Sequence, residues 1–188
     1  MNHSGDSAPR IILVTGNTQS GKSSLIEGLI PDLKQRNLKL AGILAKGLWE
    51  NNIRSGFILI DLKRNKSVPL AQRVRNHDRN TVPFEFFPSG IKAGRRALSV
   101  ESCAGADIVV VDEVGRLETA GMGWAPFLMP LLQLKDAVHI WVVRTGLVND
   151  VCEIWNLDRP PQVRANEPNA SDRLLNLILE IRRKIPRD

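Results

Sequence analysis

The sequence has few of the residues from which disulfides and metal clusters are built. It contains two cysteines and three histidines in 188 residues. Cys103 and Cys152 lie far apart and form no metal-binding or redox motif, and the histidines are scattered along the chain. We therefore expect two free thiols in a reducing cytoplasm and no metal cluster.

Long apolar segments are also missing. Residues 1–10 are polar, include a proline and lack the apolar core of a signal peptide. The uncharged residues 120–134 are interrupted by Pro126 and Pro130 and are too few to cross a bilayer. We expect neither a targeting segment nor a membrane partner, and a cytoplasmic location.

Basic charge is in excess, with a formal net charge of +6 and an isoelectric point near 9.7. Such charge attracts nucleic acid, serves polyphosphate ligands or keeps a surface solvated. Aromatic residues make up 5% of the chain and form no RNA-binding platform, and no zinc-finger or helix-turn-helix pattern accompanies the charge. A solvated surface is the favoured interpretation, and nucleic acid stays an alternative partner.

The length fits one globular α/β domain covering residues 1–188, in which we expect residues 1–9 to be flexible. The sequence leaves the oligomeric state open. A last helix is expected near the C-terminus, capped by Asn169 or Ser171. Hydrophobic periodicity predicts strands at 10–15, 40–45, 55–61, 68–71, 107–113, 137–143 and 162–165, and further helices near 22–36, 90–104, 124–134 and 147–155.

The three predicted strands between residues 40 and 71 follow one another with no room for a helix. They predict an antiparallel hairpin excursion from an otherwise parallel, doubly wound sheet with helices on both faces. Residues 72–88 are charged and then bounded by prolines, so we expect an irregular connection there.

One segment, residues 16–23, matches the P-loop pattern G-x-x-x-x-G-K-[ST] at every fixed position. An apolar, β-branched run at 11–14 precedes it, and apolar residues at helical spacing follow at 24–30. Strand, glycine loop and helix are the context that the motif requires. The plain alternative is a glycine-rich turn before an ordinary helix. The match predicts a binding site for a nucleoside triphosphate.

The residue types of the P-loop have defined tasks. Gly16 and Gly21 let successive backbone N–H groups turn toward phosphate oxygens, and the following helix adds its N-terminal amides. Lys22 reaches the β- and γ-phosphates, and the Ser23 hydroxyl is a ligand for Mg²⁺. We predict that the nucleotide is bound by Gly16, Asn17, Thr18, Gln19, Ser20, Gly21, Lys22, Ser23 and Ser24.

A second candidate group follows the apolar run at 107–111, which ends in Asp112 and Glu113. A continuous apolar run is typical of a strand buried in a parallel sheet, and ligands bind at the carboxyl ends of such strands. Asp112 is the predicted Walker-B ligand of Mg²⁺. Glu113 points to the opposite face of the strand and is predicted to orient or deprotonate a water. A solvated turn is the alternative, which the P-loop upstream disfavours.

Further candidates stand near the same predicted edge. Arg144 follows an apolar strand and is predicted to contact the γ-phosphate as an internal arginine finger, with an exposed ion pair as the equal alternative. Arg116 is a comparable candidate, and Glu118 is predicted to anchor the Walker-B loop or cap the next helix. Four aromatic residues can stack on a base, although core packing is favoured for each: Trp49, Phe84, Trp124 and Trp155.

Three blocks of the chain, spanning residues 11–118, resemble the THEP1-type nucleoside-triphosphatase family of small P-loop proteins. The first is the P-loop. The second is Leu40-Ala41-Gly42-Ile43, leading across a turn to Arg54-Ser55-Gly56-Phe57 and Val68-Pro69-Leu70-Ala71, which is similar to the family's hairpin. The third, residues 111–118, resembles the family's extended Walker B, D-E-[IV]-G-x-[ML]-E, and the strand end at 142–144 is similar too.

The resemblance implies a Rossmann-like P-loop fold and Mg²⁺-dependent hydrolysis of ATP, GTP and other triphosphates to diphosphate and phosphate, with loose base selectivity. By position, Lys22 and Ser23 serve the phosphates and Mg²⁺, Asp112 serves the metal, and Glu113 the water. The chain departs from the family at residues 115–116, where lysine or proline is common, and matches it loosely at 72–88. No base-recognising residue is therefore transferred.

Hydrolysis is the favoured function, and two others stay open. One is a small P-loop phosphotransferase, in which the hairpin and residues 72–88 hold an acceptor nucleotide or metabolite. The other is a nucleotide-gated binding module that assists RNA or a metal-cofactor pathway, with turnover serving only as a switch.

Overall fold

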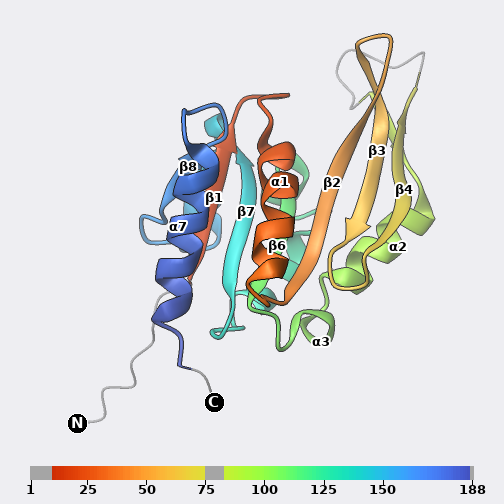
Figure 1. Cartoon of the computed structure of the whole chain (residues 1–188). Coiled ribbons are helices and arrows are strands. Elements are labelled where there is room, and N and C mark those ends of the chain that lie inside the picture. Colours follow the sequence, from red (N-terminus) through yellow and green to blue (C-terminus); the bar gives the residue numbers. More distant parts are fainter. Residues whose placement is uncertain (1–9, 75–82, 187–188) are drawn as a thin grey trace.

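The computed structural model describes residues 10–74 and 83–186, whose strands form one eight-stranded sheet (Figure 1). The strand order is β5-β4-β3-β2-β6-β7-β1-β8. The strands are β1 (Ile11–Gly16), β2 (Leu40–Glu50), β3 (Ile53–Asp61), β4 (Lys66–Arg73), β5 (Phe84–Phe86), β6 (Ile108–Val114), β7 (Val138–Arg144) and β8 (Gln162–Arg164). The prediction of flexibility at residues 1–9 lies outside the described residues.

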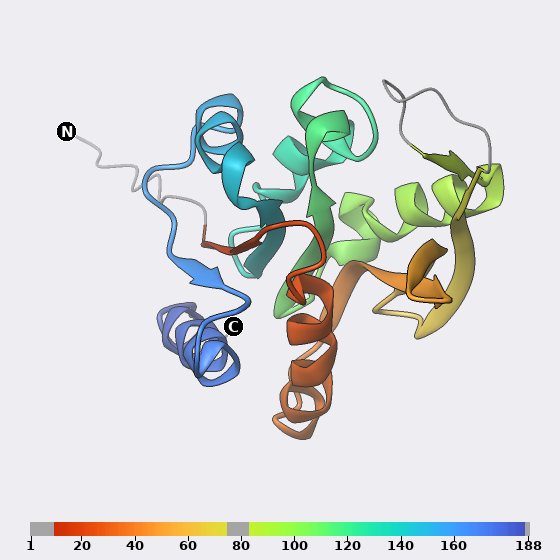
Figure 2. The same cartoon turned by 90° about the horizontal axis from the view of Figure 1, so that it is seen from above.

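Helices lie on both faces of the sheet, as predicted (Figure 2). The helices are α1 (Lys22–Gln35), α2 (Pro88–Ala97), α3 (Val100–Cys103), α4 (Arg116–Thr119), α5 (Ala125–Leu131), α6 (Val148–Ile154) and α7 (Ala170–Arg183), with a 3₁₀ turn at Thr145–Leu147. Within the described ranges, none of them is long and apolar enough to span a bilayer.

The parallel half of the sheet contains β2, β6, β7, β1 and β8, and its central strands β1, β6 and β7 are buried on both sides. On one face α1 and α7 pack their apolar residues against the sheet, for example Leu29 and Leu174. The other face is covered by α2, α3, α5 and α6, which contribute residues such as Leu128 and Val151. Near-continuous apolar runs in β1, β6 and β7 follow from this double burial.

The antiparallel half contains β2, β3, β4 and β5, so the predicted hairpin excursion is correct. Its first two strands are longer than predicted, because β2 continues to Glu50 and the turn occupies Asn51 and Asn52. Both turn residues have positive φ, at 49° and 61°, which asparagine tolerates better than most residues.

The expected irregular connection at 72–88 is wrong where the structure describes it. Residues 72–73 belong to β4, 84–86 form β5, and Pro88 begins α2. The short strand β5 pairs with the edge of β4, and the Phe84 ring lies edge-on to Phe57 at 5.0 Å between centroids. A strand of three residues is too short to show a periodic hydrophobic pattern, so the sequence alone does not reveal a strand that forms through contacts with distant residues.

The single helix expected at 90–104 is two helices. The first, α2, ends at Ala97, and α3 begins after Ser99, whose Oγ accepts a hydrogen bond from the Ser102 amide at 3.1 Å. Serine favours such N-cap positions because its hydroxyl satisfies an amide that has no partner within the helix. The final helix begins after Asn169 as predicted, without a side-chain cap bond.

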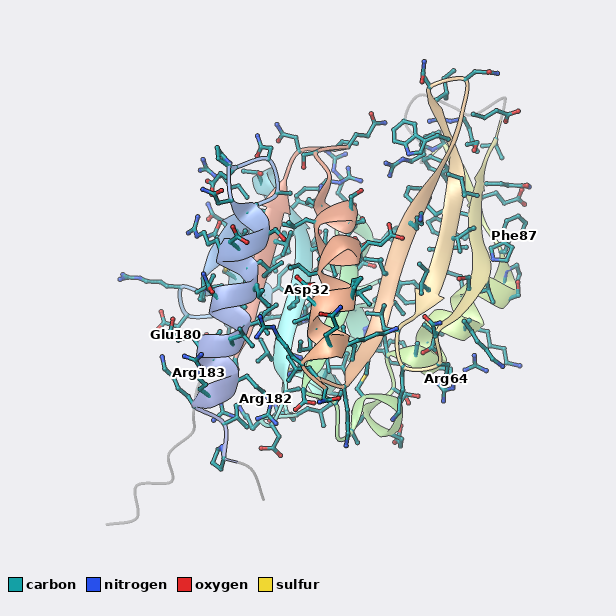
Figure 3. All side chains as sticks on the ribbon, viewed as in Figure 1. Asp32, Arg64, Phe87, Glu180, Arg182 and Arg183 are labelled. Carbon is teal, nitrogen blue, oxygen red and sulfur yellow. The ribbon has the colours of Figure 1, made fainter. Side chains whose placement is uncertain are left out.

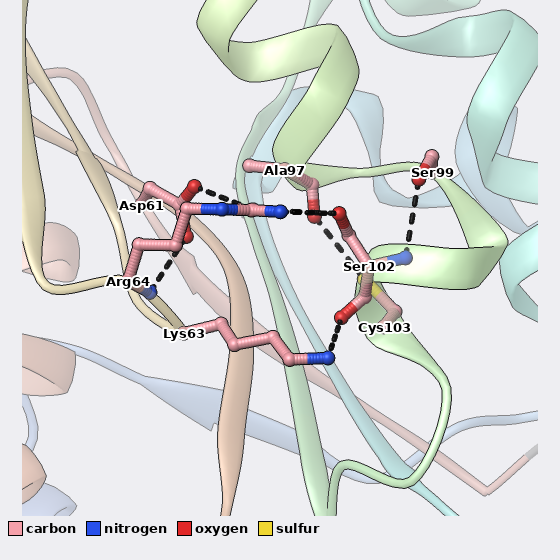
Figure 4. A network of polar contacts seen from close by, with 7 residues as sticks. All are labelled: Asp61, Lys63, Arg64, Ala97, Ser99, Ser102 and Cys103. Atoms are coloured by element: carbon pink, nitrogen blue, oxygen red, sulfur yellow. Dashed lines mark hydrogen bonds and ion pairs between the residues drawn. The ribbon is translucent and has the colours of Figure 1, made fainter.

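Polar contacts fix the end of the sheet opposite the carboxyl ends of the parallel strands. At the β3–β4 turn, Asp61 accepts bonds at 3.0 Å from both the backbone and the guanidinium of Arg64 (Figure 4). In the same network, the Lys63 ammonium donates to the Ser102 carbonyl at 2.7 Å, which ties the turn to α3 (Figure 4).

A second tie holds the last helix to the sheet. Arg182, at the lower end of α7 in Figure 3, donates from Nε to Asp107 at 2.8 Å, just before β6 begins. The other oxygen of Asp107 accepts from the Lys39 amide at 2.8 Å. Polar contacts therefore hold this end of the sheet together, and the loops that follow the parallel strands lie at the opposite end.

Candidate active site

The carboxyl ends of β1, β6 and β7 meet at one edge of the sheet, and the sequence-predicted residues follow those ends. In an open α/β sheet this edge is where ligands bind, because the loops diverge there. The loop after β1 leads directly into α1, so the P-loop lies at the N-terminus of a 14-residue helix. The amides and dipole of that terminus favour anions.

The P-loop geometry depends on its two glycines. A Cβ on Gly16 would lie 2.1 Å from Ser20 Oγ, and Gly21 precedes α1 with a φ of +85°. Neither position accepts an ordinary side chain without strain. Of the predicted nucleotide-binding residues, Gly16 and Lys22 are buried, Ser20 and Ser23 are half-buried, and Asn17, Thr18, Gln19, Gly21 and Ser24 are exposed.

Lys22 turns back over the loop. Its Nζ donates to the Asn17 carbonyl at 2.7 Å and to the Gly16 carbonyl at 3.2 Å. The side chain is 6% exposed, and this burial lowers the pKa of Lys22 below its ordinary value. The carboxylates of Glu113 and Asp112 oppose that shift, so both lie within electrostatic range of the ammonium.

Asp112 is buried at the carboxyl end of β6, where two hydrogen-bond donors hold its carboxylate. The Ala45 amide of β2 donates to Oδ2 at 3.0 Å, and the Ser23 hydroxyl donates to the same carboxylate. Asp112 is 2% exposed, and burial raises its pKa to about 7 against the effect of these bonds. The structure thus brings together the two predicted magnesium ligands, one from α1 and one from β6.

Glu113 is paired with Arg144, which ends the neighbouring strand β7. One carboxylate oxygen, Oε1, accepts from Arg144 Nε at 3.0 Å and lies 2.9 Å from Nη2. The side chains are 32% and 43% exposed, so the pair stands at the surface of the edge. Of the two sequence interpretations of Arg144, the structure has the ion pair, and the partner is the predicted water-positioning glutamate.

Glu118 performs both of the tasks that were predicted as alternatives. Its Oε2 accepts from the Gly115 amide at 2.8 Å and caps α4, while Oε1 accepts from the Trp124 amide at 3.1 Å. Burial raises the pKa of this carboxyl group. Arg116, by contrast, is exposed in the first turn of α4.

Core packing is the correct prediction for Trp124 and Trp155, which are 6% and 5% exposed. Trp155 lies edge-on to Trp141 at 5.5 Å between ring centroids. Phe84 is half-buried on the edge of the sheet. Trp49 is 50% exposed at the end of the β2–β3 hairpin, so core packing is wrong for this residue.

Sequence reasoning missed one residue at the site, Arg54 of β3. Its positive charge helps to lower the pKa of Lys22, and the charges of Glu113 and Asp112 act on both residues. The signal was present in the segment Arg54-Ser55-Gly56-Phe57, which carries a charged residue just after the β2–β3 turn. Nothing in the local pattern shows that the hairpin brings this residue to the P-loop edge.

These features recur in known proteins. A family model described as NTPase matches residues 11–157. The chain belongs to the NTPase family. That match covers the P-loop, the hairpin, the Walker-B strand and Arg144, which are the parts that form the site.

Curated relatives in the NTPase family carry the same activity in their names. The nucleoside-triphosphatase THEP1 of Korarchaeum cryptofilum is 30% identical over 171 residues, or 88% of this chain and 83% of the relative. The THEP1 protein of Methanopyrus kandleri is 27% identical over 180 residues, or 92% and 97% of the two chains. The match to THEP1 of Ignicoccus hospitalis is 29% identical and spans 60% of that protein. The predicted family and its nucleoside-triphosphatase activity are confirmed.

Two solved structures share the fold. A human cancer-related nucleoside triphosphatase superposes with a TM-score of 0.69 at 14% identity, covering 93% of this chain and 98% of that one. THEP1 from Aquifex aeolicus superposes with a TM-score of 0.65 at 14% identity, covering 94% and 99%. The Rossmann-like P-loop fold is thus confirmed.

Proposed function

We propose that this NTPase hydrolyses ATP, GTP and other nucleoside triphosphates to the diphosphate and phosphate in a Mg²⁺-dependent reaction, with loose base selectivity. The observation that carries the proposal is the convergence of the P-loop, Asp112 and the Glu113–Arg144 pair on one sheet edge. A cytoplasmic location and nucleic acid as a weaker alternative partner stay predictions from the sequence.

The donor set at Ser23 and Asp112 suits Mg²⁺. Magnesium prefers hard oxygen ligands and takes one or two from the protein, completing its shell with phosphate oxygens and water. The described residues contain no cluster of three or more histidine, cysteine or acidic side chains that could hold a metal ion. A bound divalent cation would favour the ionised form of Asp112. Its chemical contribution is to neutralise charge on the β- and γ-phosphate oxygens.

The P-loop residues bind and orient the triphosphate in this proposal. Backbone amides of Gly16–Ser24 surround the phosphates, and Lys22 exchanges its bonds to the loop carbonyls for bonds to the β- and γ-phosphate oxygens. Lys22 is already buried, so its charge acts in a medium of low dielectric constant.

Glu113 orients the attacking water. The water oxygen forms a bond to the γ-phosphorus, the bond from that phosphorus to the bridging oxygen breaks, and the nucleoside diphosphate leaves. One water proton passes to Glu113 or to a phosphate oxygen. Arg144 holds the carboxylate in position through its two contacts at 3.0 and 2.9 Å and is thus a positioning residue.

The test is release of phosphate from ATP, GTP, CTP and UTP with Mg²⁺, comparing the wild type with Glu113→Gln. We expect release from all four substrates, and a fall in kcat of on the order of a hundred-fold in the variant with nucleotide affinity retained. Glu180→Gln is the matched control, because Glu180 is exposed on α7 and pairs only with Lys184 among the described residues.

Two results would contradict the proposal. Full activity of Glu113→Gln would assign the water to another residue. Tight nucleotide binding with almost no release by the wild type would favour a phosphotransferase that lacks its acceptor, or a nucleotide-gated module.

A further inference from the structure

The β2–β3 hairpin extends past the end of the parallel sheet. Pairing of β2 with β6 ends at Ile43 and Val111, and the Ala45 amide bonds to Asp112 directly above that point. Beyond that point, β2 pairs only with β3. The second residue of β3 is Arg54, which lies opposite Trp49. In Figure 1 the hairpin rises on the same side of the sheet as the β1–α1 loop. Its outer part therefore borders the site that the P-loop and Asp112 define.

Two aromatic rings and a glycine hold the Arg54 side chain in place. Its Cζ lies 4.6 Å from the centroid of the Trp49 ring and 5.0 Å from that of Phe57. On β2, a Cβ added to Gly47 would lie 2.8 Å from the same Cζ, so the guanidinium occupies the space that glycine leaves. A long side chain that is confined in this way loses little further freedom when it binds a ligand.

Arg54 has no anionic partner among the described residues. Its Nε is enclosed and makes no hydrogen bond, whereas Arg144, Arg64 and Arg182 each pair with a carboxylate. A half-buried guanidinium without an acceptor is costly, since burial removes its hydration. Protein hydrogen-bond donors left in this condition at a site are suited to a ligand that supplies the acceptors.

The charges that act on Arg54 belong to the other residues of the site. Burial lowers the pKa of Arg54, while Glu113 and then Asp112 act against the shift and Arg144 acts with it. Arg54 in turn adds to the lowering of the Lys22 pKa. The guanidinium thus interacts electrostatically with four charged groups of the site, from α1, β6 and β7.

We propose that Arg54 is a catalytic residue that binds the γ-phosphate oxygens and stabilises the negative charge that develops on them during transfer to water. The sequence suggested this role for Arg144. In the structure, however, the guanidinium of Arg144 is paired with Glu113. The guanidinium fork matches phosphate oxygens and is supplied within the same chain. The inference rests on the proposed hydrolysis and adds the source of its cationic stabilisation.

The experiment compares four variants in steady-state phosphate release and in binding of MgATP and of MgADP with aluminium fluoride, a mimic of the transferring phosphoryl group. Arg54→Ala removes the cation, and Arg54→Lys keeps the charge without the fork. Gly47→Ala keeps the arginine and displaces its guanidinium, which is the flexible neighbour at that position. Arg95→Ala is the control, because Arg95 is exposed on α2 and its loss changes the net charge equally.

We expect Arg54→Ala to lower kcat by on the order of a hundred-fold or more, with MgATP affinity changed by less than ten-fold. Gly47→Ala should also lower kcat. Arg54→Lys should recover only a small part of the kcat that Arg54→Ala loses, and Arg95→Ala should leave kcat unchanged. The transition-state mimic should lose far more affinity than MgATP in Arg54→Ala.

Other outcomes separate the two proposals. If the wild type and Glu113→Gln behave as expected but folded Arg54→Ala keeps its kcat, the role of Arg54 is overturned and hydrolysis stands. Equal loss of affinity for MgATP and the mimic would make Arg54 a ground-state binding residue, which also overturns the inference. Failure of the wild type to release phosphate would refute the hydrolysis itself.

Discussion

Lys22 shows at the scale of one residue how the site is prepared for a polyanion. Its ammonium is buried, and its acceptors among the described residues are two loop carbonyls, at 2.7 and 3.2 Å. Carbonyl acceptors carry partial charge, so full charges on phosphate oxygens are better partners and can replace them. The structure thus already holds the ammonium at the P-loop, bonded to acceptors that phosphate oxygens can replace.

Substitution of Lys22 by alanine should lower affinity for MgATP by at least a hundred-fold. Each charge-assisted bond contributes about 1.5–3 kcal/mol, and the ammonium makes two with the phosphates. Isothermal titration calorimetry measures the effect, with Lys46→Ala as the matched control because Lys46 is exposed and pairs with Glu27 of α1. Unchanged affinity of Lys22→Ala would refute the P-loop assignment.

At the scale of an element, β2 links the parallel half of the sheet to the hairpin. It pairs in parallel with β6 along Leu40–Ile43 and antiparallel with β3 along its remaining length. Gly42 lies in the parallel part with a φ of +90°, opposite Val110, and a Cβ there would lie 2.0 Å from the Val110 carbonyl oxygen. Close approach of the two backbones at this point keeps Ala45 in contact with Asp112.

Gly42→Ala should therefore destabilise the fold by about 3 kcal/mol or more, because the backbone is strained for a side chain and the obstructing atom is backbone. Gly28→Ala is the opposite control, since that glycine lies on α1 with nothing near its missing Cβ. There alanine should stabilise by about 0.5–1 kcal/mol. Urea unfolding measures both, and equal stability of the two variants would contradict the prediction.

In the whole molecule, one apolar layer packs on each face of the sheet. Titratable groups buried between these layers make the free energy of unfolding depend on pH. His139 of β7 is 1% exposed, donates from Nε2 to the Leu134 carbonyl at 3.1 Å and leaves Nδ1 without a partner in the described structure. Burial lowers its pKa to about 4, and the charge of Lys135 acts in the same direction. The unfolded chain holds this imidazole in water, where its pKa is near 6.5.

Acidification should therefore cost stability through His139. Between pH 6.5 and 4 the unfolded chain binds a proton that the folded protein rejects, so this contribution to the free energy of unfolding falls with pH. From pH 7 to pH 5 the loss is about 2 kcal/mol. The prediction concerns the difference between wild type and His139→Gln in urea unfolding at each pH, because other groups, including Asp112 with its raised pKa, cancel in that difference. A constant difference across this range would contradict it.

The same series tests the predicted single domain. Two-state unfolding of one domain gives coincident transitions by fluorescence and circular dichroism.

Local patterns were sufficient for much of the fold. The apolar runs of β1, β6 and β7 and the amphipathic spacing of α1 and α7 are long enough to be identified without tertiary contacts. Short elements such as β5 and α4 were missed, because strand pairing and the buried Glu118 create them. The break at Ser99 was missed for a related reason, since a single hydroxyl bond to the Ser102 amide caps the start of the second helix.

The sequence by itself determined the nature of the ligand. The P-loop spacing specifies a triphosphate ligand through residue type alone, since glycine freedom and a lysine are needed at fixed positions, and the Asp112-Glu113 pair predicts the metal and water sites. Only the tertiary structure decided how the remaining charges are divided. Arg144 and Arg54 are the same residue type, but β7 ends beside Glu113, whereas the hairpin carries Arg54 between two aromatic rings and without an ion-pair partner among the described residues. Electrostatic roles depend on distance and burial, and those are set by the packing of strands far apart in the sequence.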